Sequence, residues 1–252
     1  YKFSENAGRS IEDDIKAGDF LFIQFGHNDD DTKSGNTMYN RMVPLGTPDA
    51  NGIYPVIPGE KVPTTHLPEK FKKDFASSVA AAETEIAKYG SEYYSYDCGG
   101  TYKWFLKQYI DFARSKGATP VLVTPVARVS FNSDGTLRSG PGLHGENFAY
   151  VEAVRQLAKE ENCLLIDLFD CTKSMIETAT KAYANYLMAI VPNDLNGQWP
   201  SGYDNTYGNT AEGFEKVEAT HYNKYGAYLT AAMAIEKIMG DNSVCENGEC
   251  FN

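Results

Sequence analysis

Residues 20–29, with the sequence FLFIQFGHND, decide the fold of this chain of 252 residues. The first part, residues 20–25, is a short and nearly continuous apolar run, which is typical of a buried strand in a parallel sheet. The second part, residues 26–29, is small and polar and predicts a turn where the strand ends. Because open parallel sheets bind ligands outside the carboxyl ends of their strands, this turn is a candidate for function.

Residues 121–126 (VLVTPV) and 164–168 (LLIDL) predict two further buried strands for the same reason. Apolar residues between and after the strands recur at helical spacing, which predicts helices. The helices are defined by the alanine-rich range 71–88 and by three sets of residues: Phe105, Leu106, Tyr109, Ile110 and Ala113; Phe148, Val151, Val154 and Leu157; Tyr225, Leu229, Ala232 and Met233. Strands that alternate with helices predict an α/β fold with a parallel sheet covered on both faces, in a single domain over residues 1–252.

The charge and hydropathy of the chain argue against two classes of partner. The formal net charge is −11 at pH 7, whereas a protein that binds nucleic acid needs a basic surface for the phosphate backbone. No apolar run is long enough to span a bilayer. We therefore expect no nucleic acid and no membrane among the partners of the protein.

The five cysteines include no CxxC pair, so no zinc ribbon or thioredoxin-type site is predicted. Cys245 and Cys250 flank a short polar loop near the end of the chain. Two interpretations stay open, namely a disulfide that closes this loop or a pair of free thiols. Two long polar stretches, residues 30–67 and 192–216, interrupt the strands and helices, and loops of this length are usually functional or disordered.

Two groups of residues are candidates for chemistry. Asn28 follows the first strand, where its side-chain N–H is suited to donate to a developing oxyanion, although Asn-Asp is also ordinary in turns. Glu218 lies three residues before His221, on the expected loop into the last helix. A carboxylate at this spacing orients an imidazole as a general base toward a serine hydroxyl, and the alternative is that His221 only precedes the helix.

Four segments occur in a fixed order along the chain: FIQFGHND (22–29), KGATPVLVTPVAR (116–128), LAKEENCLLIDL (157–168) and ATHYNKYGA (219–227). As an ordered set they resemble the SGNH (GDSL-like) hydrolases, in the branch of the rhamnogalacturonan acetylesterases. The resemblance covers nearly the whole chain. It implies a flavodoxin-like three-layer α/β/α sandwich with a parallel sheet.

The resemblance also implies roles for single residues. Asn28 matches the asparagine of the oxyanion hole, and His221 matches the general base. Glu218 stands where the family has the aspartate of its DxxH motif, and the extra methylene of glutamate changes its reach. Gly26 is expected to let the backbone turn tightly beneath Asn28, and Asp29 to support the turn.

Other residues beside these motifs are interpreted more modestly. His27 is expected to support the turn rather than to act in the reaction. Arg128 either contacts substrate or forms a salt bridge at the surface.

The nucleophile of the family is a serine in a Gly-Asp-Ser motif at the end of the first strand, and this sequence contains no such motif. Ser10 follows Gly8-Arg9, but its distance from Gly26 fits the helix before the strand better. Without the first strand, residues 20–25 would be an exposed apolar edge. We therefore expect the nucleophile and the missing first strand or strands upstream of Tyr1.

Together these features imply a secreted or cell-surface bacterial carbohydrate O-acetylesterase. It is expected to need no metal or organic cofactor and to act on acetylated pectin-type polysaccharide or oligosaccharide. Trp199, Tyr203, Tyr207 and Phe214 either stack against its sugars or pack their own loop. The alternatives are a non-catalytic carbohydrate-binding relative and another SGNH esterase or lipase, although the polar loops do not suit a lipid substrate. The sequence leaves the oligomeric state open.

Overall fold

The computed structural model describes residues 11–30, 43, 45–58, 100–191 and 216–240. The chain divides into two compact units. The first unit comprises Tyr1–Thr124 and Gly140–Leu165, and the second comprises Pro125–Ser139 and Ile166–Asn252. The predicted helix at 71–88 lies outside the described residues. A single domain over residues 1–252 stays a prediction.

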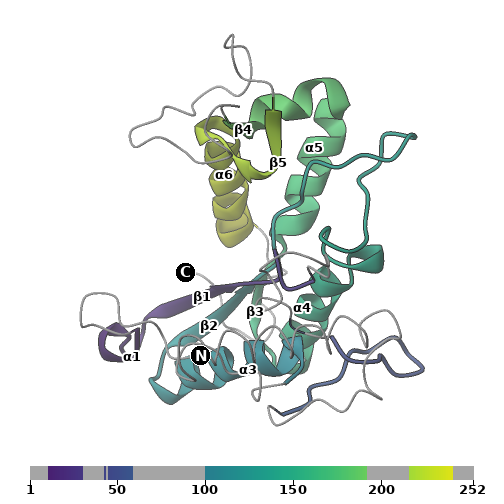
Figure 1. Cartoon of the computed structure of the whole chain (residues 1–252). Coiled ribbons are helices and arrows are strands. Elements are labelled where there is room, and N and C mark those ends of the chain that lie inside the picture. The colour runs from purple at the N-terminus through teal and green to yellow at the C-terminus, as the bar shows by residue number, and fades with distance from the viewer. Residues whose placement is uncertain (1–10, 31–42, 44, 59–99, 192–215, 241–252) are drawn as a thin grey trace, which may run out of the picture. The chain divides into compact units, whose positions relative to one another are not determined.

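A parallel sheet is the centre of the α/β architecture (Figure 1). Its strand order is β1 (Phe20–Gln24), β2 (Thr119–Val123) and β3 (Leu164–Ile166). β1 and β2 run in parallel, from Phe20 opposite Thr119 to Gln24 opposite Val123. The predicted α/β class with a parallel sheet is therefore confirmed, and the order of the elements agrees with a flavodoxin-like sandwich.

Two helices, α3 (Tyr102–Ser115) and α4 (Ala149–Glu160), pack against each other and against β2. Their apolar stripes are buried as the spacing predicted, and they form one core together with residues of β1 and β2. The buried members of this core are Ile23, Leu45, Tyr102, Leu106, Ile110, Leu122, Ala149, Tyr150, Ala153, Val154, Leu157 and Ala158. Alternation along β1 points Ile23 into this core, whereas Phe20 and Phe22 on the other side are 45% and 50% exposed.

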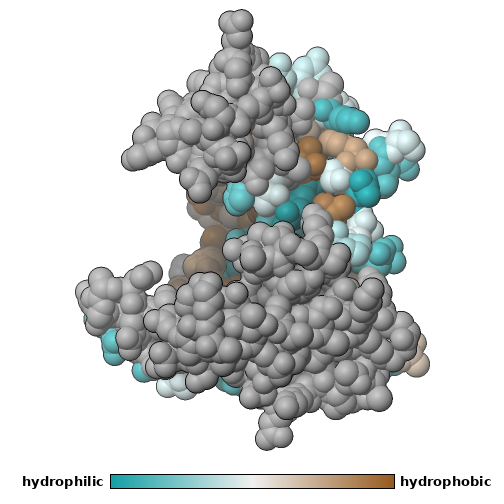
Figure 2. All heavy atoms as spheres, viewed as in Figure 1, coloured by the Kyte–Doolittle hydropathy of each residue, from teal (hydrophilic) through white to brown (hydrophobic). Residues whose placement is uncertain are grey.

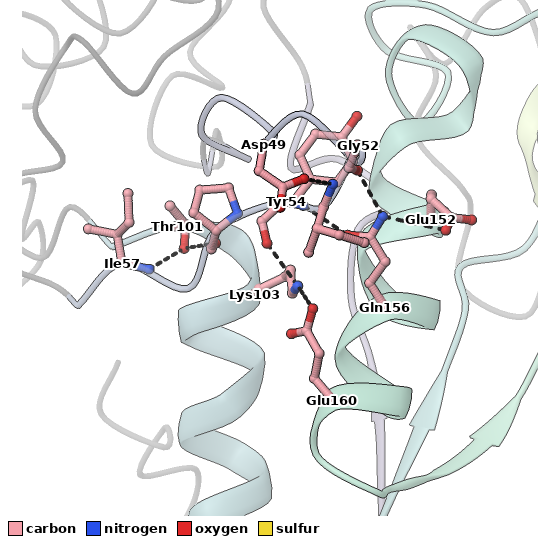
Figure 3. Close-up of polar contacts among 11 residues, drawn as sticks. Asp49, Gly52, Tyr54, Ile57, Thr101, Lys103, Glu152, Gln156 and Glu160 are labelled. Atoms are coloured by element: carbon pink, nitrogen blue, oxygen red, sulfur yellow. Dashed lines mark hydrogen bonds and ion pairs between the residues drawn. The ribbon is translucent and has the colours of Figure 1, made fainter.

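The irregular segment 45–58 is fixed to both helices by side-chain hydrogen bonds (Figure 3). Thr101, at the start of α3, accepts from the Ile57 backbone N–H at 3.0 Å and donates to the Pro55 carbonyl at 2.9 Å. Gln156 of α4 accepts from the Tyr54 backbone N–H at 2.9 Å. This part of the predicted polar stretch 30–67 is thus irregular, as expected, and it is tied firmly to the first unit.

Lys103 is a buried cation that joins the same segment to α4. Its side chain is 1% exposed, and its Nζ lies 2.6 Å from the Glu160 Oε1. The same Nζ donates to the Tyr54 carbonyl at 2.8 Å, so a carboxylate and a carbonyl both compensate the buried charge (Figure 3).

The second unit is built from helices and an antiparallel pair of strands. Its elements are α5 (Leu168–Ala184), the 3₁₀ helix η4 (Asn185–Leu187), β4 (Met188–Val191), β5 (Lys216–Tyr222) and α6 (Lys224–Gly240). α5 packs against α6. Residues of α5 line an open, polar hollow, and they are Asp170, Lys173, Ser174, Glu177 and Thr178. Figure 2 shows hydrophilic side chains interspersed with small apolar patches on this unit.

The predicted strand 164–168 is wrong at its carboxyl end, because β3 ends at Ile166 and α5 begins at Leu168. Asp167 separates them, and its side chain accepts a hydrogen bond from the Asp170 backbone N–H at 3.4 Å. Asp is a preferred residue at the start of a helix for this reason. No helix among the described residues is both long and apolar enough to cross a bilayer.

Candidate active site

The turn 26–29 lies just after the carboxyl end of β1 and is closed by the side chain of Asp29. Gly26 has a φ of 98°, a conformation that residues with a Cβ rarely adopt. Its backbone N–H donates to the Asp29 Oδ2 at 2.8 Å, and the Asp29 carbonyl accepts from the Val43 N–H at 2.9 Å. Asn28 is half-buried in the middle of this turn. The geometry therefore fixes the backbone on either side of the predicted oxyanion donor.

Two neighbouring carboxyl groups, those of Asp29 and Asp30, lie at the end of the turn. Desolvation raises the pKa of Asp29 to about 6, the hydrogen bond from Gly26 lowers it, and the nearby charge of Asp30 raises it. Asp30 is fully buried, and its Oδ2 accepts from the Gly145 backbone N–H at 2.6 Å. The turn is thus backed by an acidic and largely dry environment.

Two tyrosines of the core lie near these carboxyl groups. Tyr102 and Tyr150 are buried with their ring centroids 5.1 Å apart. Burial raises the pKa of both phenols well above the ordinary value, and the charges of Asp29 and Asp30 raise it further. The Tyr150 hydroxyl donates to the Val43 carbonyl at 2.7 Å. Val43, whose N–H donates to the Asp29 carbonyl, is thus held in place as well.

His221 lies near the end of the strand β5. The prediction that it lies on a loop into the last helix is therefore wrong. β5 pairs antiparallel with β4, but the pairing is irregular here. Met188 pairs with Tyr222 and Ile190 pairs with Val217, so residues 218–221 of β5 lie opposite Ala189 alone. His221 therefore belongs to a bulge, a device that re-aims side chains and is common beside active sites. Its side chain is exposed.

Side chains hold this bulge where the strand ladder does not. Arg128 Nη1 donates to the Thr220 Oγ1 at 2.8 Å, one residue before His221. On the other side, the Tyr222 hydroxyl donates to the Ala127 carbonyl at 3.0 Å. Arg128, for which substrate binding and a surface salt bridge were the two expectations, thus contacts the strand that carries His221.

The chain is also tightly constrained immediately after β5. Asn223 is buried and donates through Nδ2 to the carbonyls of Tyr186 and Met188, at 2.7 and 3.2 Å. Its Oδ1 accepts from the Gly226 N–H at 2.9 Å. A Cβ at Gly226 would overlap the Leu187 carbonyl. Glycine is therefore required where α6 begins against η4.

The predicted site residues fall into the two units. Gly26, Asn28 and Asp29 share one turn of the first unit, and His221 belongs to the second. The backbone of Glu218 is part of β5, while its side chain lies outside the described residues. The predicted aromatic residues 199–214, the pair Cys245 and Cys250, and Ser10 also lie outside the described residues. The roles assigned to all these residues stay predictions.

Sequence reasoning missed the residues that brace the two groups, namely Asp30, His144 and Thr220. Asp30 has a weak signal in the run Asp29-Asp30-Asp31, and His144 has one in its place between glycines in GPGLHG. Neither signal indicates which distant backbone the side chain contacts. Within the described ranges, no group of three or more His, Cys, Asp or Glu residues is arranged to hold a metal ion.

No family model matches the chain. The chain is similar to the probable rhamnogalacturonan acetylesterase YesY of Bacillus subtilis (strain 168), with 38% identity over 96 residues, which are 37% of this chain and 41% of YesY. It is also similar to the rhamnogalacturonan acetylesterase RhgT of the same strain, with 29% identity over 138 residues, 55% of this chain and 51% of RhgT.

Among solved structures, the chain is similar to the Bacillus subtilis protein YXIM, with 18% identity and a TM-score of 0.44, over 91% of this chain and 39% of that one. This score is too low to carry an argument. The matched regions span about half the length of the curated relatives or less, 51% of RhgT and 41% of YesY. Both curated relatives carry the name that the ordered motifs predicted. The predicted resemblance is thereby confirmed: the chain is similar in sequence to two curated rhamnogalacturonan acetylesterases, over part of their length.

Proposed function

We propose that the protein is a serine-dependent carbohydrate O-acetylesterase that removes acetyl groups from a rhamnogalacturonan-type pectin. The observation that carries the proposal is the sequence relationship to YesY and RhgT, which are both named rhamnogalacturonan acetylesterases. The turn of Asn28 at the carboxyl end of β1 supports it, since this end of a parallel sheet is where ligands bind. Export to the outside of a bacterial cell is part of the proposal.

In the proposed reaction, a serine expected upstream of Tyr1 attacks the acetyl carbonyl carbon. His221 accepts the serine proton and returns it to the sugar oxygen as that C–O bond breaks. Water then attacks the acetyl carbon of the acetyl-enzyme while His221 takes a proton from it, and His221 returns this proton to the serine oxygen as the bond from that oxygen to the acetyl carbon breaks and acetate leaves. The Asn28 side-chain N–H stabilises the oxyanion in both steps, and Glu218 orients the imidazole. No metal or organic cofactor takes part in these steps.

The structure supports these roles through rigidity. Electrostatic stabilisation requires donors that are in place before charge develops, and the closed turn around Asn28 meets this requirement. A general base must likewise be held in one orientation. The contacts of Thr220 and Tyr222 hold the backbone on both sides of His221.

Acetate release from acetylated rhamnogalacturonan tests the proposal. We expect the wild type to release acetate, His221→Ala to lower kcat by at least about 10⁴-fold, and Asn28→Ala to lower it by about 100-fold or more. Asn51→Ala, an asparagine replacement in an exposed turn of the same unit, serves as the matched control and should leave kcat unchanged. Full activity of His221→Ala would contradict the proposed mechanism.

One observation favours a second candidate, a non-catalytic carbohydrate-binding relative. Glu218 stands where the family has aspartate, and the extra methylene changes how a carboxylate meets the imidazole. A binding protein would retain acetylated oligosaccharide with its ester intact, as mass spectrometry of the bound sugar would show. Glu218→Asp separates the two candidates, because it should keep or raise the kcat of an esterase and leave a binding protein without activity. Hydrolysis of lipid esters in preference to acetylated sugars would instead indicate another SGNH esterase.

A further inference from the structure

Residues 140–148, here called the 140–148 loop, contain an unusual number of positive φ angles, and the proposed reaction assigns them no role. Three residues with side chains have positive φ angles, namely His144 at 67°, Asn147 at 53° and Phe148 at 57°. Left-handed conformations are uncommon for histidine and phenylalanine, and strained backbone of this kind tends to gather at functional sites. The concentration of such residues in one short loop calls for a physical reason.

The loop is closed on itself by backbone hydrogen bonds. Gly140 and Gly145 exchange two of them, at 2.9 and 3.1 Å, and the Leu143 N–H donates to the Gly140 carbonyl at 2.9 Å. The His144 carbonyl accepts from the Tyr150 N–H at 3.1 Å, which joins the loop to the first turn of α4. His144 is 1% exposed. Its side chain is therefore presented from a rigid frame.

Two consecutive residues of this loop hold both ends of the turn that carries Asn28. His144 Nδ1 lies 3.1 Å from the Gly26 carbonyl oxygen, and the Gly145 N–H donates to the Asp30 Oδ2 at 2.6 Å. Gly26 is two residues before Asn28 and Asp30 is two residues after it. The contact spans more than a hundred residues of sequence and brackets Asn28 symmetrically.

The contact with the Gly26 carbonyl requires a proton on Nδ1 of His144. A carbonyl oxygen only accepts hydrogen bonds, so Nδ1 carries the proton and donates it to the Gly26 carbonyl. The rings of His27 and His144 are also in contact, with centroids 5.2 Å apart. His144 thus touches two of the residues that lead into Asn28.

We propose that His144 is a positioning residue that fixes the Asn28 side chain at the place where the oxyanion develops. The proposal rests on the proposed esterase function for its catalytic consequence. An oxyanion donor is effective only when its position is set before the reaction, and an error of about 1 Å costs up to about 100-fold in rate. The 140–148 loop supplies this precision, and its strained backbone is the cost of presenting His144 and Gly145 side by side.

Two substitutions at position 144 separate the hydrogen bond from the backbone strain. Glycine adopts a φ of 67° without strain and removes the donor, whereas asparagine tolerates this φ and keeps a donor near the place of Nδ1. We expect His144→Gly to lower kcat on acetyl ester by about 10- to 100-fold with KM changed less than about twofold. His144→Asn should recover most of this loss.

The pair Asp30→Asn and Asp30→Ala repeats the test at the other end of the turn and serves if His144→Gly does not fold. Asparagine keeps the side-chain acceptor for the Gly145 N–H, whereas alanine leaves this N–H with the Gly140 carbonyl and removes its contact with the turn. We expect kcat to fall for Asp30→Ala and to fall much less for Asp30→Asn. Equal losses within both pairs, or losses in proportion to a lowered unfolding midpoint, would mean that His144 and Asp30 only stabilise the fold.

A second measurement does not depend on activity. The side-chain amide protons of Asn28 give NMR signals that report whether the side chain has one position. We expect sharp, distinct signals in the wild type and in His144→Asn, and broadened or shifted signals in His144→Gly. Unchanged Asn28 signals in His144→Gly overturn the positioning role even if the enzyme is active. If these signals change as expected while the wild type releases no acetate, the positioning role holds and the proposed function fails.

Discussion

The ionisation of Asp29 links the candidate site to the stability of the fold. Its pKa rises from 3.8 to about 6 on folding, mainly through desolvation, so the folded protein binds this proton more tightly than the unfolded chain. The stabilisation is complete below the unfolded pKa and is lost as pH rises through the folded value. At neutral pH the carboxylate is therefore kept ionised beneath Asn28 at a cost in stability.

Asp29→Asn should remove this pH dependence, because the amide Oδ1 still accepts from the Gly26 N–H but does not ionise. We expect the stability of the wild type relative to the variant to fall by roughly 2–3 kcal/mol between about pH 4 and about pH 6.5. Urea unfolding of both proteins at a series of pH values measures the difference. A difference that is the same at every pH would show that the pKa of Asp29 is not raised in the folded protein.

The contribution of the hydrogen bond between Arg128 and Thr220 to the free energy of unfolding can also be measured. Thr220→Val keeps the shape of the side chain but removes the acceptor, and it should cost about 1 kcal/mol of unfolding free energy. Thr220→Ser keeps a hydroxyl and should cost less. In an Arg128→Met background the valine substitution should cost almost nothing, because the pair is already broken. Thermal or urea unfolding of the four proteins gives the coupling energy, and a coupling of zero would contradict the contact.

At the scale of elements, the strands and helices of the first unit could be predicted from sequence because their signals are local. Leu106 and Ile110 recur at helical spacing on α3, as Val154 and Leu157 do on α4, and all four are buried as expected. The end of β3 could not be predicted, since apolar residues stand on both sides of Asp167 and only the capping role of its side chain separates strand from helix. The bulge at His221 was missed for a related reason. It depends on the register between β4 and β5, which the residues of β5 alone do not determine.

The ion pair that joins α3 to α4 gives a prediction at this scale. Glu160→Ala leaves the Lys103 charge buried without the carboxylate that lies 2.6 Å from its Nζ, although the hydrogen bond to the Tyr54 carbonyl remains. We expect a loss of about 2–3 kcal/mol of unfolding free energy, somewhat less than for a fully buried pair because Glu160 is partly exposed. Asp111→Ala breaks the exposed pair of Lys107 with Asp111 on α3 and serves as the control, with an expected loss below about 0.5 kcal/mol. Similar losses of unfolding free energy for both variants would show that the buried pair stabilises the fold no more than the exposed pair does.

The candidate site shows the same division between local and distant signals. The sequence locates the turn 26–29 and the residue His221, since each sits beside a recognisable motif. It does not locate His144 or Arg128 as braces, because each contacts backbone or side chain that is far away in sequence. Candidate residues for chemistry are thus proposed from motifs, while the residues that contact their surroundings become visible only in the fold.

At the scale of the whole molecule, charge sets a condition on the proposed substrate. The chain carries a formal net charge of −11 at pH 7. A rhamnogalacturonan-type pectin is itself a polyanion, because its galacturonate units carry carboxylates. Long-range repulsion between like charges slows encounter and weakens binding, and dissolved salt screens this repulsion.

We therefore expect the KM for acetylated rhamnogalacturonan to fall, and kcat to stay constant, as ionic strength rises from about 0.01 M to about 0.15 M, over which the screening length shrinks from about 30 Å to about 8 Å. The KM for a neutral substrate such as 4-nitrophenyl acetate should not change over the same range, which makes it the control. Initial rates of acetate or nitrophenol release at several substrate concentrations measure both constants. A KM for the polysaccharide that rises with salt would instead show that a local basic surface binds the polymer despite the acidic molecule. A KM that does not depend on salt would place the substrate contacts on neutral sugar positions beyond the reach of the overall charge.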